Sequence, residues 1–242
     1  MTDQEQIYNK NSDEKIHQSK GVYIAILNQG AIRPELSYLV TDFTHQNKYR
    51  LYLSYPAAKP ISFNRNTIVK DFLAKKEYDY LLMIDSDIIP PLNYLDLIDH
   101  LADEDKDIIS GVCFAYMDNG IVPLVLEYNP DKNDKPFLVK SLDGDEGLVE
   151  VDAVGTGAMA IKRKVLEQVK APFINRYDED GMKLMGLDLS FCDKAKKLGF
   201  RTWCHLDYVC SHWTKVDLKE IYRSLQANEE IKKMSLKNNA KK

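Results

Sequence analysis

YLLMIDSD, residues 80–87, is an apolar run that ends abruptly in two carboxylates one residue apart. Such a run is typical of a buried strand, which Pro90 and Pro91 would terminate. In an open α/β sheet, ligands bind beyond the carboxyl ends of the strands. Asp85 and Asp87 would then lie at the rim of a cleft, as oxygen ligands for Mg²⁺ or Mn²⁺ and a phosphorylated substrate. The alternative is a solvated Asp-Ser-Asp turn that merely ends a strand.

The segments around this run alternate between strand and helix patterns. Apolar runs predict strands at 22–27, 49–55, 79–84 and 107–112, and helical spacing predicts helices at 34–46, 66–75 and 93–101. This alternation predicts an α/β domain with a mostly parallel sheet. Residues 113–154 predict a small antiparallel excursion with a mobile loop. The remaining segments predict helices at 163–170 and 188–198 and two short strands, 200–204 and 208–211.

The composition is that of an ordinary globular protein. The 242 residues are 44% hydrophobic and 29% charged, which suits one domain with a sizeable core. A net charge of −4 gives no electrostatic footprint for nucleic acid, so we expect no such partner. Four cysteines without framework spacing favour a cytoplasmic setting. No apolar run approaches the length of a membrane span.

The chain divides into three predicted segments. Residues 1–20 are polar and predict a frayed leader without a signal peptide, and 21–215 form the folded domain. Residues 216–242 predict a C-terminal helix with a lysine-rich tail. This helix is expected to be solvated, and peripheral attachment to an anionic membrane is the alternative.

Two motifs suggest chemistry that their context does not favour. The glycines of Gly155-Thr156-Gly157 match a dinucleotide fingerprint, but residues 158–161 predict a strand where that fingerprint needs a helix. Close backbone approach at a cleft wall is the favoured role of these glycines. Four potential zinc ligands cluster with spacing that fits zinc poorly, and the cysteines among them, with Cys192, suit small buried apolar roles: Cys204, His205, Cys210 and His212.

Two further residues keep alternative roles open. Asp188 opens a helix, where it could be a first-turn or N-cap carboxylate or a general base. His212 ends a late strand at the sheet edge that would bind ligands, where it could be structural or a ligand.

Four motifs in this order resemble nucleotide-sugar-dependent glycosyltransferases of the GT-A fold, especially the family-2-like group. The resemblance spans roughly residues 21–213. The matching segments are the apolar strand with Asp85-Ser86-Asp87, then residues 154–163, residues 187–200 and residues 209–212.

The resemblance implies a GT-A fold: a Rossmann-like, mostly parallel central sheet flanked by helices, with a small antiparallel excursion. It implies metal-dependent transfer of a hexose-like sugar from a nucleoside diphosphate sugar, UDP being favoured over GDP, to a glycan, protein or small-molecule acceptor. Asp85, Asp87 and His212 would hold Mn²⁺ or Mg²⁺, and Asp188 would be the catalytic base. The residues implied for donor binding are Asn28, Gln29, Arg65, Asn66, Ser86, Gly155, Thr156 and Gly157.

The chain departs from the family pattern at two places. Leu187 stands where relatives usually carry glutamate, and the first strand ends in Asn28-Gln29-Gly30 rather than a proline-containing turn. The first departure keeps a non-catalytic sugar-nucleotide-binding module open as an alternative. A phosphohydrolase with an Asp nucleophile is a second alternative, although Ile89 and the late position of the motif fit it poorly.

Overall fold

A computed structural model describes residues 20–28, 30–57, 60–102, 105–117, 120–129 and 137–215, together with residues 219, 223 and 226. The predicted leader up to residue 19 and Gln29 lie outside the described residues. So does most of the predicted C-terminal helix and tail.

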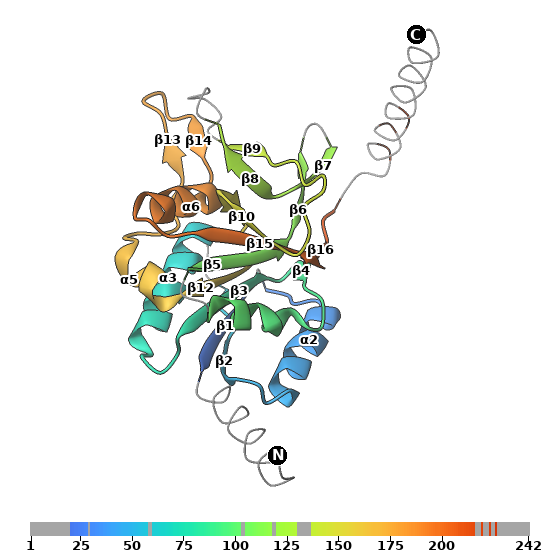
Figure 1. Ribbon diagram of the computed structural model, residues 1–242, viewed down its shortest axis with the longest axis vertical. Helices are drawn as coiled ribbons and strands as arrows, with labels where there is room; N and C mark the ends of the chain where they lie inside the picture. Colours follow the sequence, from blue (N-terminus) through green and yellow to red (C-terminus); the bar gives the residue numbers. More distant parts are fainter. Residues whose placement is uncertain are drawn as a thin grey trace, which may run out of the picture.

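The core of the molecule is a seven-stranded sheet with the strand order β10-β15-β5-β12-β3-β1-β2 (Figure 1). Five strands run in one direction, because β12 is antiparallel to both β3 and β5, and β10 is antiparallel to β15. The strand bounds are β1 Gly21–Leu27, β2 Arg50–Ser54, β3 Tyr80–Asp85, β5 Ile108–Val112, β10 Leu148–Val151, β12 Ala158–Lys162 and β15 Thr202–Val209.

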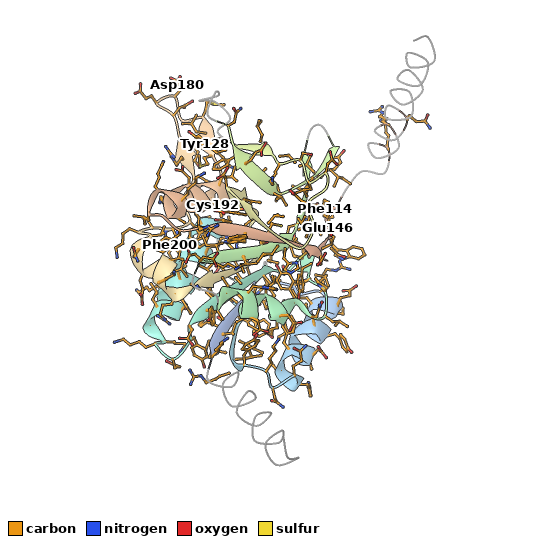
Figure 2. The ribbon with its side chains drawn as sticks, in the orientation of Figure 1. Phe114, Tyr128, Glu146, Asp180, Cys192 and Phe200 are labelled. Atoms are coloured by element: carbon orange, nitrogen blue, oxygen red, sulfur yellow. The ribbon has the colours of Figure 1, made fainter. Side chains whose placement is uncertain are left out.

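Helices cover both faces of this sheet. One buried cluster joins α3 (Ile61–Ala74), α5 (Arg163–Gln168) and α6 (Leu187–Lys197) to one face, and it includes Cys192, which Figure 2 labels. The other cluster contains residues of α2 (Pro34–His45), the 3₁₀ turn η1 (Tyr94–Asp96) and α4 (Leu97–Leu101). Side chains of β1 alternate between the two clusters, which explains why every residue of this strand is buried.

Outside the main sheet are a short three-stranded antiparallel sheet, β11-β8-β9, and the antiparallel pairs β13-β14, β16-β4 and β6-β7 (Figure 1). Among them, β13–β14 lies near α6, while β8 and β9 lie near β10. The bounds are β4 Ile88–Ile89, β6 Phe114–Met117, β7 Gly120–Pro123, β8 Val125–Tyr128, β9 Phe137–Val139, β11 Ala153–Val154, β13 Arg176–Tyr177, β14 Lys183–Met185 and β16 Ser211–His212. The predicted α/β fold class, a mostly parallel sheet with flanking helices and an antiparallel excursion, is confirmed.

Two boundary predictions are wrong. Helix α3 begins at Ile61, directly after Pro60, rather than at residue 66. Its first turns contain buried Asn64 and Arg65, whose polar side chains obscured the apolar stripe. The two late strands predicted at 200–204 and 208–211 are largely one strand, β15, with an irregularity in its pairing to β5 between His205 and Val209.

The cysteines are all buried and none is in a disulfide, as predicted for Cys192, Cys204 and Cys210. In the described part of the chain, no helix is both long and apolar enough to cross a bilayer.

Candidate functional site

The backbone of the Asp-Ser-Asp motif is fixed between two neighbouring strands. The Asp85 N–H donates to the Gly157 carbonyl at 2.8 Å, and the Ser86 N–H donates to the Leu27 carbonyl at 2.8 Å. A Cβ on Gly157 would lie 3.0 Å from Cγ1 of Ile88, so the glycine leaves room for that side chain. The observed role of Gly157 is therefore close packing against the Ile88 side chain.

A short strand pair brings His212 to the motif. Strand β16 pairs with β4, which directly follows Asp87, and the Asp87 carbonyl also accepts the Trp213 N–H at 2.9 Å. The His212 Nε2 atom lies 3.5 Å from Oδ2 of Asp87. The His212 Nδ1 atom lies 2.5 Å from the Phe114 carbonyl, which can only accept, so Nδ1 carries the proton. The Nε2 atom faces Asp87, the orientation that metal-ligating histidines obtain from a backbone carbonyl.

Asp85 is held by a buried cation. Nη2 of Arg65 lies 3.0 Å and 2.8 Å from the two carboxylate oxygens of Asp85. Burial raises the pKa of Asp85 to about 6, Arg65 acts to lower it, and the nearby Asp188 and Asp87 carboxylates raise it further. The aspartate thus keeps a charge that the guanidinium stabilises above about pH 6.

The structure brings together two of the three predicted metal ligands. Asp87 and His212 face each other at nearly the spacing of about 3 Å that adjacent ligands of one divalent ion adopt. Asp85 is engaged by Arg65, and no group of three His, Cys, Asp or Glu side chains within the described residues is arranged to hold an ion. The residues therefore fit an ion that takes its other ligands from water and phosphate oxygens.

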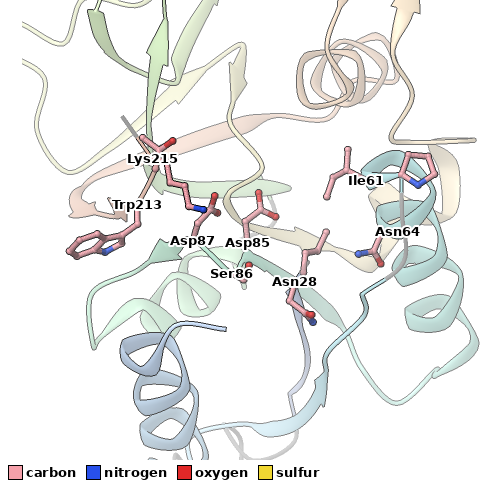
Figure 3. A pocket seen from close by; sticks show the side chains of 11 residues that line it. Asn28, Ile61, Asn64, Asp85, Ser86, Asp87, Trp213 and Lys215 are labelled. Atoms are coloured by element: carbon pink, nitrogen blue, oxygen red, sulfur yellow. The ribbon is translucent and has the colours of Figure 1, made fainter. Parts of the chain in front are cut away.

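Asp85, Ser86 and Asp87 line a cleft of about 810 Å³, a size suited to a small-molecule ligand. Figure 3 shows Asp85, Ser86 and Asp87 in the middle, between Trp213 and Lys215 on one side and Asn28, Ile61 and Asn64 on the other. The cleft lies where the parallel strands β1 and β3 end, the edge of the sheet that the sequence predicted.

Asp188 lies in a second cavity of about 400 Å³, and Ile61 lines both cavities. The helix α6 has Gly186 as its N-cap residue, so Asp188 is a first-turn residue rather than the cap. Its carboxylate accepts two hydrogen bonds from Thr156, at 2.7 Å from Oγ1 and 3.3 Å from the backbone N–H. The Thr156 carbonyl in turn accepts from Arg65 at 3.4 Å. A chain of polar contacts thus links Asp85 to Asp188.

The predicted donor-binding residues are distributed over different surroundings. Asn28 and Ser86 line the larger cleft, and Arg65 and Gly155 line the second cavity. Thr156 is fully buried and lines neither cavity.

Two asparagines predicted to bind the donor have side chains that hydrogen-bond to the protein backbone. The side chain of Asn28 donates to the Tyr55 and Pro56 carbonyls, although the residue still lines the cleft. The side chain of Asn66 exchanges hydrogen bonds of 2.7 Å and 3.2 Å with Phe173, and Asn66 lines neither cavity.

Sequence reasoning missed Asn64, Trp213 and Lys215. Asn64 is 1% exposed, and its Oδ1 atom has no hydrogen-bond partner among the described residues, although the residue lines the larger cleft. Cζ of Arg33 lies 4.0 Å from the centre of the Trp213 ring, and this cation–π contact anchors the wall of the cleft. Trp213 directly follows His212 and Lys215 comes two residues later, so the end of β16 was the signal that could have identified them.

Replacing Arg65 with Met should lower the free energy of unfolding more at pH 8 than at pH 5. The side chains of Arg65 and Asp85 are 4% and 26% exposed, so we expect a loss of about 2 kcal/mol at pH 8, less than for a fully buried pair. The folded-state pKa of Asp85 already exceeds the unfolded value and would rise further without Arg65. The folded variant then binds a proton more readily than the unfolded chain, so stability returns as pH falls toward 5. Denaturant titrations at pH 8 and pH 5 measure this difference.

The matched control is Arg201→Met, which removes a guanidinium that is 41% exposed and paired with Glu150 and Asp105. It should cost less than about 1 kcal/mol. Equal losses for Arg65→Met at the two pH values would contradict the assigned pairing.

Comparison with known proteins identifies a fold relative. Neither a protein-family model nor a curated protein matches the chain. A197 from STIV has a TM-score of 0.51 and 22% sequence identity, covering 81% of this chain and 86% of that one. This likeness shows a shared fold.

Two further solved structures match at lower scores. One is a glycosyltransferase involved in the glycosylation of the major capsid of PBCV-1, with a TM-score of 0.34 and 13% identity over 60% of this chain and 62% of that one. The other is the inositol-1-phosphate CTP transferase from T. maritima, with a TM-score of 0.45 and 10% identity over 86% and 96%. Scores at this level do not bear on the assignment of this chain.

Proposed function

We propose that this chain is a metal-dependent glycosyltransferase that moves a sugar from a nucleoside diphosphate sugar, with UDP favoured as the nucleotide, to an acceptor hydroxyl. The observation that carries the proposal is the pairing of His212 with Asp87, which lines a cleft that shares Ile61 with a second, Asp188-containing cavity. One cavity is suited to a charged donor and the other to an acceptor, and Ile61 lies between them.

The larger cleft has the groups that a nucleoside diphosphate needs. A bound Mg²⁺ or Mn²⁺ would stabilise the diphosphate leaving group as a Lewis acid. Lys215 adds a cation to the cleft wall, and it suits phosphate oxygens. The buried Oδ1 atom of Asn64 can accept an N–H from a nucleobase.

Asp188 has the position expected of a general base. Thr156 holds its carboxylate with two donors, which fixes the direction in which the remaining lone pairs point. Asp188 takes the proton of the acceptor hydroxyl while the acceptor oxygen bonds to the anomeric carbon of the donor sugar. The bond from that carbon to the diphosphate oxygen breaks, and the nucleoside diphosphate leaves with the electron pair. Such general-base assistance is typically worth 10²–10⁴-fold in rate.

The proposal is tested by calorimetric binding of UDP and GDP, each with and without Mn²⁺. We expect UDP to bind in a Mn²⁺-dependent manner and Asp87→Asn to weaken that binding at least tenfold, because the variant loses one anionic ligand. Asp207→Asn is the matched control, since its side chain is 75% exposed and lies outside the cleft. Failure of both nucleotides to bind under every metal condition would refute the proposal.

Activity assays beside the binding experiment separate the alternatives. Nucleotide binding without transfer or hydrolysis would instead support a binding module. Phosphate release from phosphomonoesters, without any nucleotide sugar, would support the phosphohydrolase.

A further inference from the structure

The second cavity has a mostly aliphatic wall around the proposed base. Its apolar lining comes from four different parts of the fold, including α3, the segment before and within β8, and the start of α6. The aliphatic residues that line it are Ile61, Ala115, Leu124, Leu126, Leu187 and Leu189. A cavity lined in this way favours a ligand that carries apolar surface.

Two polar groups of the cavity, Asp188 and Asn175, offer acceptors to a ligand that donates hydrogen bonds, while Lys183 at the wall is a donor. Asp188 presents a carboxylate, which can only accept. Asn175 also lines the cavity, and its Oδ1 atom is buried without a partner among the described residues, while its Nδ2 atom donates to the Tyr177 hydroxyl at 3.3 Å. A buried acceptor without a partner is costly, and a ligand hydroxyl would satisfy it. The charge of Arg65, the wall's buried cation, is already engaged by Asp85.

Apolar surface continues outward from the cavity along the hairpin β13–β14. This hairpin lies near α6 (Figure 1), and Asn175, which lines the cavity, directly precedes its first strand. Three of its large apolar side chains are exposed, Tyr177 at 56%, Met182 at 67% and Leu184 at 43%, while Met185 is buried. Contiguous exposed apolar surface next to a cavity is typical of a binding site.

We propose that the acceptor is an amphipathic alcohol, with at least two hydroxyl groups on an aliphatic or aromatic body. One hydroxyl donates to Asp188 and receives the sugar, and a second donates to Asn175 Oδ1. The apolar body packs on Leu124, Leu126 and Leu187. This inference rests on the proposed function, since it takes Asp188 as the base.

The test compares n-octyl β-D-glucoside with methyl β-D-glucoside, below the micelle concentration, by calorimetry on the full chain with UDP and Mn²⁺ and without them. Each methylene buried is worth about a fourfold gain in affinity, so we expect the octyl compound to bind at least tenfold tighter. Leu187→Gln should remove most of this difference. Leu198→Gln, a matched change of a 51% exposed leucine at the other end of α6, should preserve it.

A second variant tests the polar half of the site. Asn175→Ala should weaken both glucosides by a similar factor, leaving their ratio unchanged, because the lost hydrogen bond is common to both. Equal affinity of the two glucosides, no binding of either, or an octyl preference that persists in Leu187→Gln would overturn the inference.

The outcomes also separate this inference from the proposed function. If UDP binds with Mn²⁺ but the octyl group brings no gain, the glycosyltransferase remains and the apolar acceptor is wrong. If the octyl preference depends on Leu187 but no nucleotide binds, the cavity is an apolar-ligand site and the glycosyltransferase is wrong.

Discussion

Asp188→Asn should lower the rate of sugar transfer by about 10²–10⁴-fold while leaving Mn²⁺-dependent UDP binding unchanged. An amide cannot take the proton of the acceptor hydroxyl. The fold should tolerate the change, because the new side chain has nearly the same shape and its oxygen can still accept the 2.7 Å hydrogen bond from Thr156 Oγ1. UDP binding should persist because Asp188 lines the second cavity and not the larger cleft. The measurement is UDP release from the UDP-sugar that the wild type turns over.

Asp193→Asn is the control for this variant. Asp193 lies on the same helix, pairs with Arg176 and Lys197, and lines neither cavity. It should keep wild-type turnover even if it lowers stability slightly. Turnover of Asp188→Asn within threefold of the wild type would show that Asp188 is not the base, whatever the outcome of the UDP titration.

Thr156, which holds Asp188, lies between the two glycines of the motif at residues 155–157. The glycine motif around it suggested a cleft wall, and Gly157 does pack closely on Ile88. The two hydrogen bonds from Thr156 to Asp188 join residues 32 positions apart, so local sequence patterns could not predict them. The fold gives Leu187 a role that the sequence did not indicate, since its aliphatic side chain lines the second cavity.

The sequence predicted best the elements that are buried along nearly their whole length. Strand β3 is buried on both faces, so its continuous apolar run identified both the strand and the aspartates at its end. Helix α3 was placed five residues too late because Asn64 and Arg65 interrupt its apolar pattern. Both residues line the proposed site, and functional sites are where local sequence rules are expected to fail.

Polar residues also misled the prediction of the late strands. Polar residues within 205–207 made β15 look like two strands, whereas it continues through an irregularity in its pairing with β5. That irregularity lies opposite Gly111, where the backbone of Tyr208 comes close to β5. The position of this glycine therefore reports a tertiary contact that the sequence pattern did not reveal.

Gly111→Ala should consequently be among the most destabilising single substitutions in the chain. A Cβ at this position would lie 2.2 Å from the Tyr208 carbonyl oxygen and 2.9 Å from the Tyr94 ring. The carbonyl belongs to the backbone of a central strand, and Tyr94 is fixed by hydrogen bonds to Gly111 and Ala158, so neither can move cheaply. We expect a loss of at least about 3 kcal/mol, which lowers Tm by roughly 6–12 °C for a chain of this size.

Gly186→Ala provides the matched control for thermal unfolding. A Cβ there would meet the Lys183 side chain at 3.7 Å, an ordinary contact, and its φ of −67° suits any residue. This variant should stay within about 1 kcal/mol of the wild type. If Gly111→Ala melts within 2 °C of the wild type, the packing of β15 over β5 is not as described. His212 lies three residues beyond the end of β15, so a displaced β15 would also carry the histidine away from Asp87. Gly111→Ala should therefore weaken Mn²⁺-dependent UDP binding even at temperatures where the variant is folded.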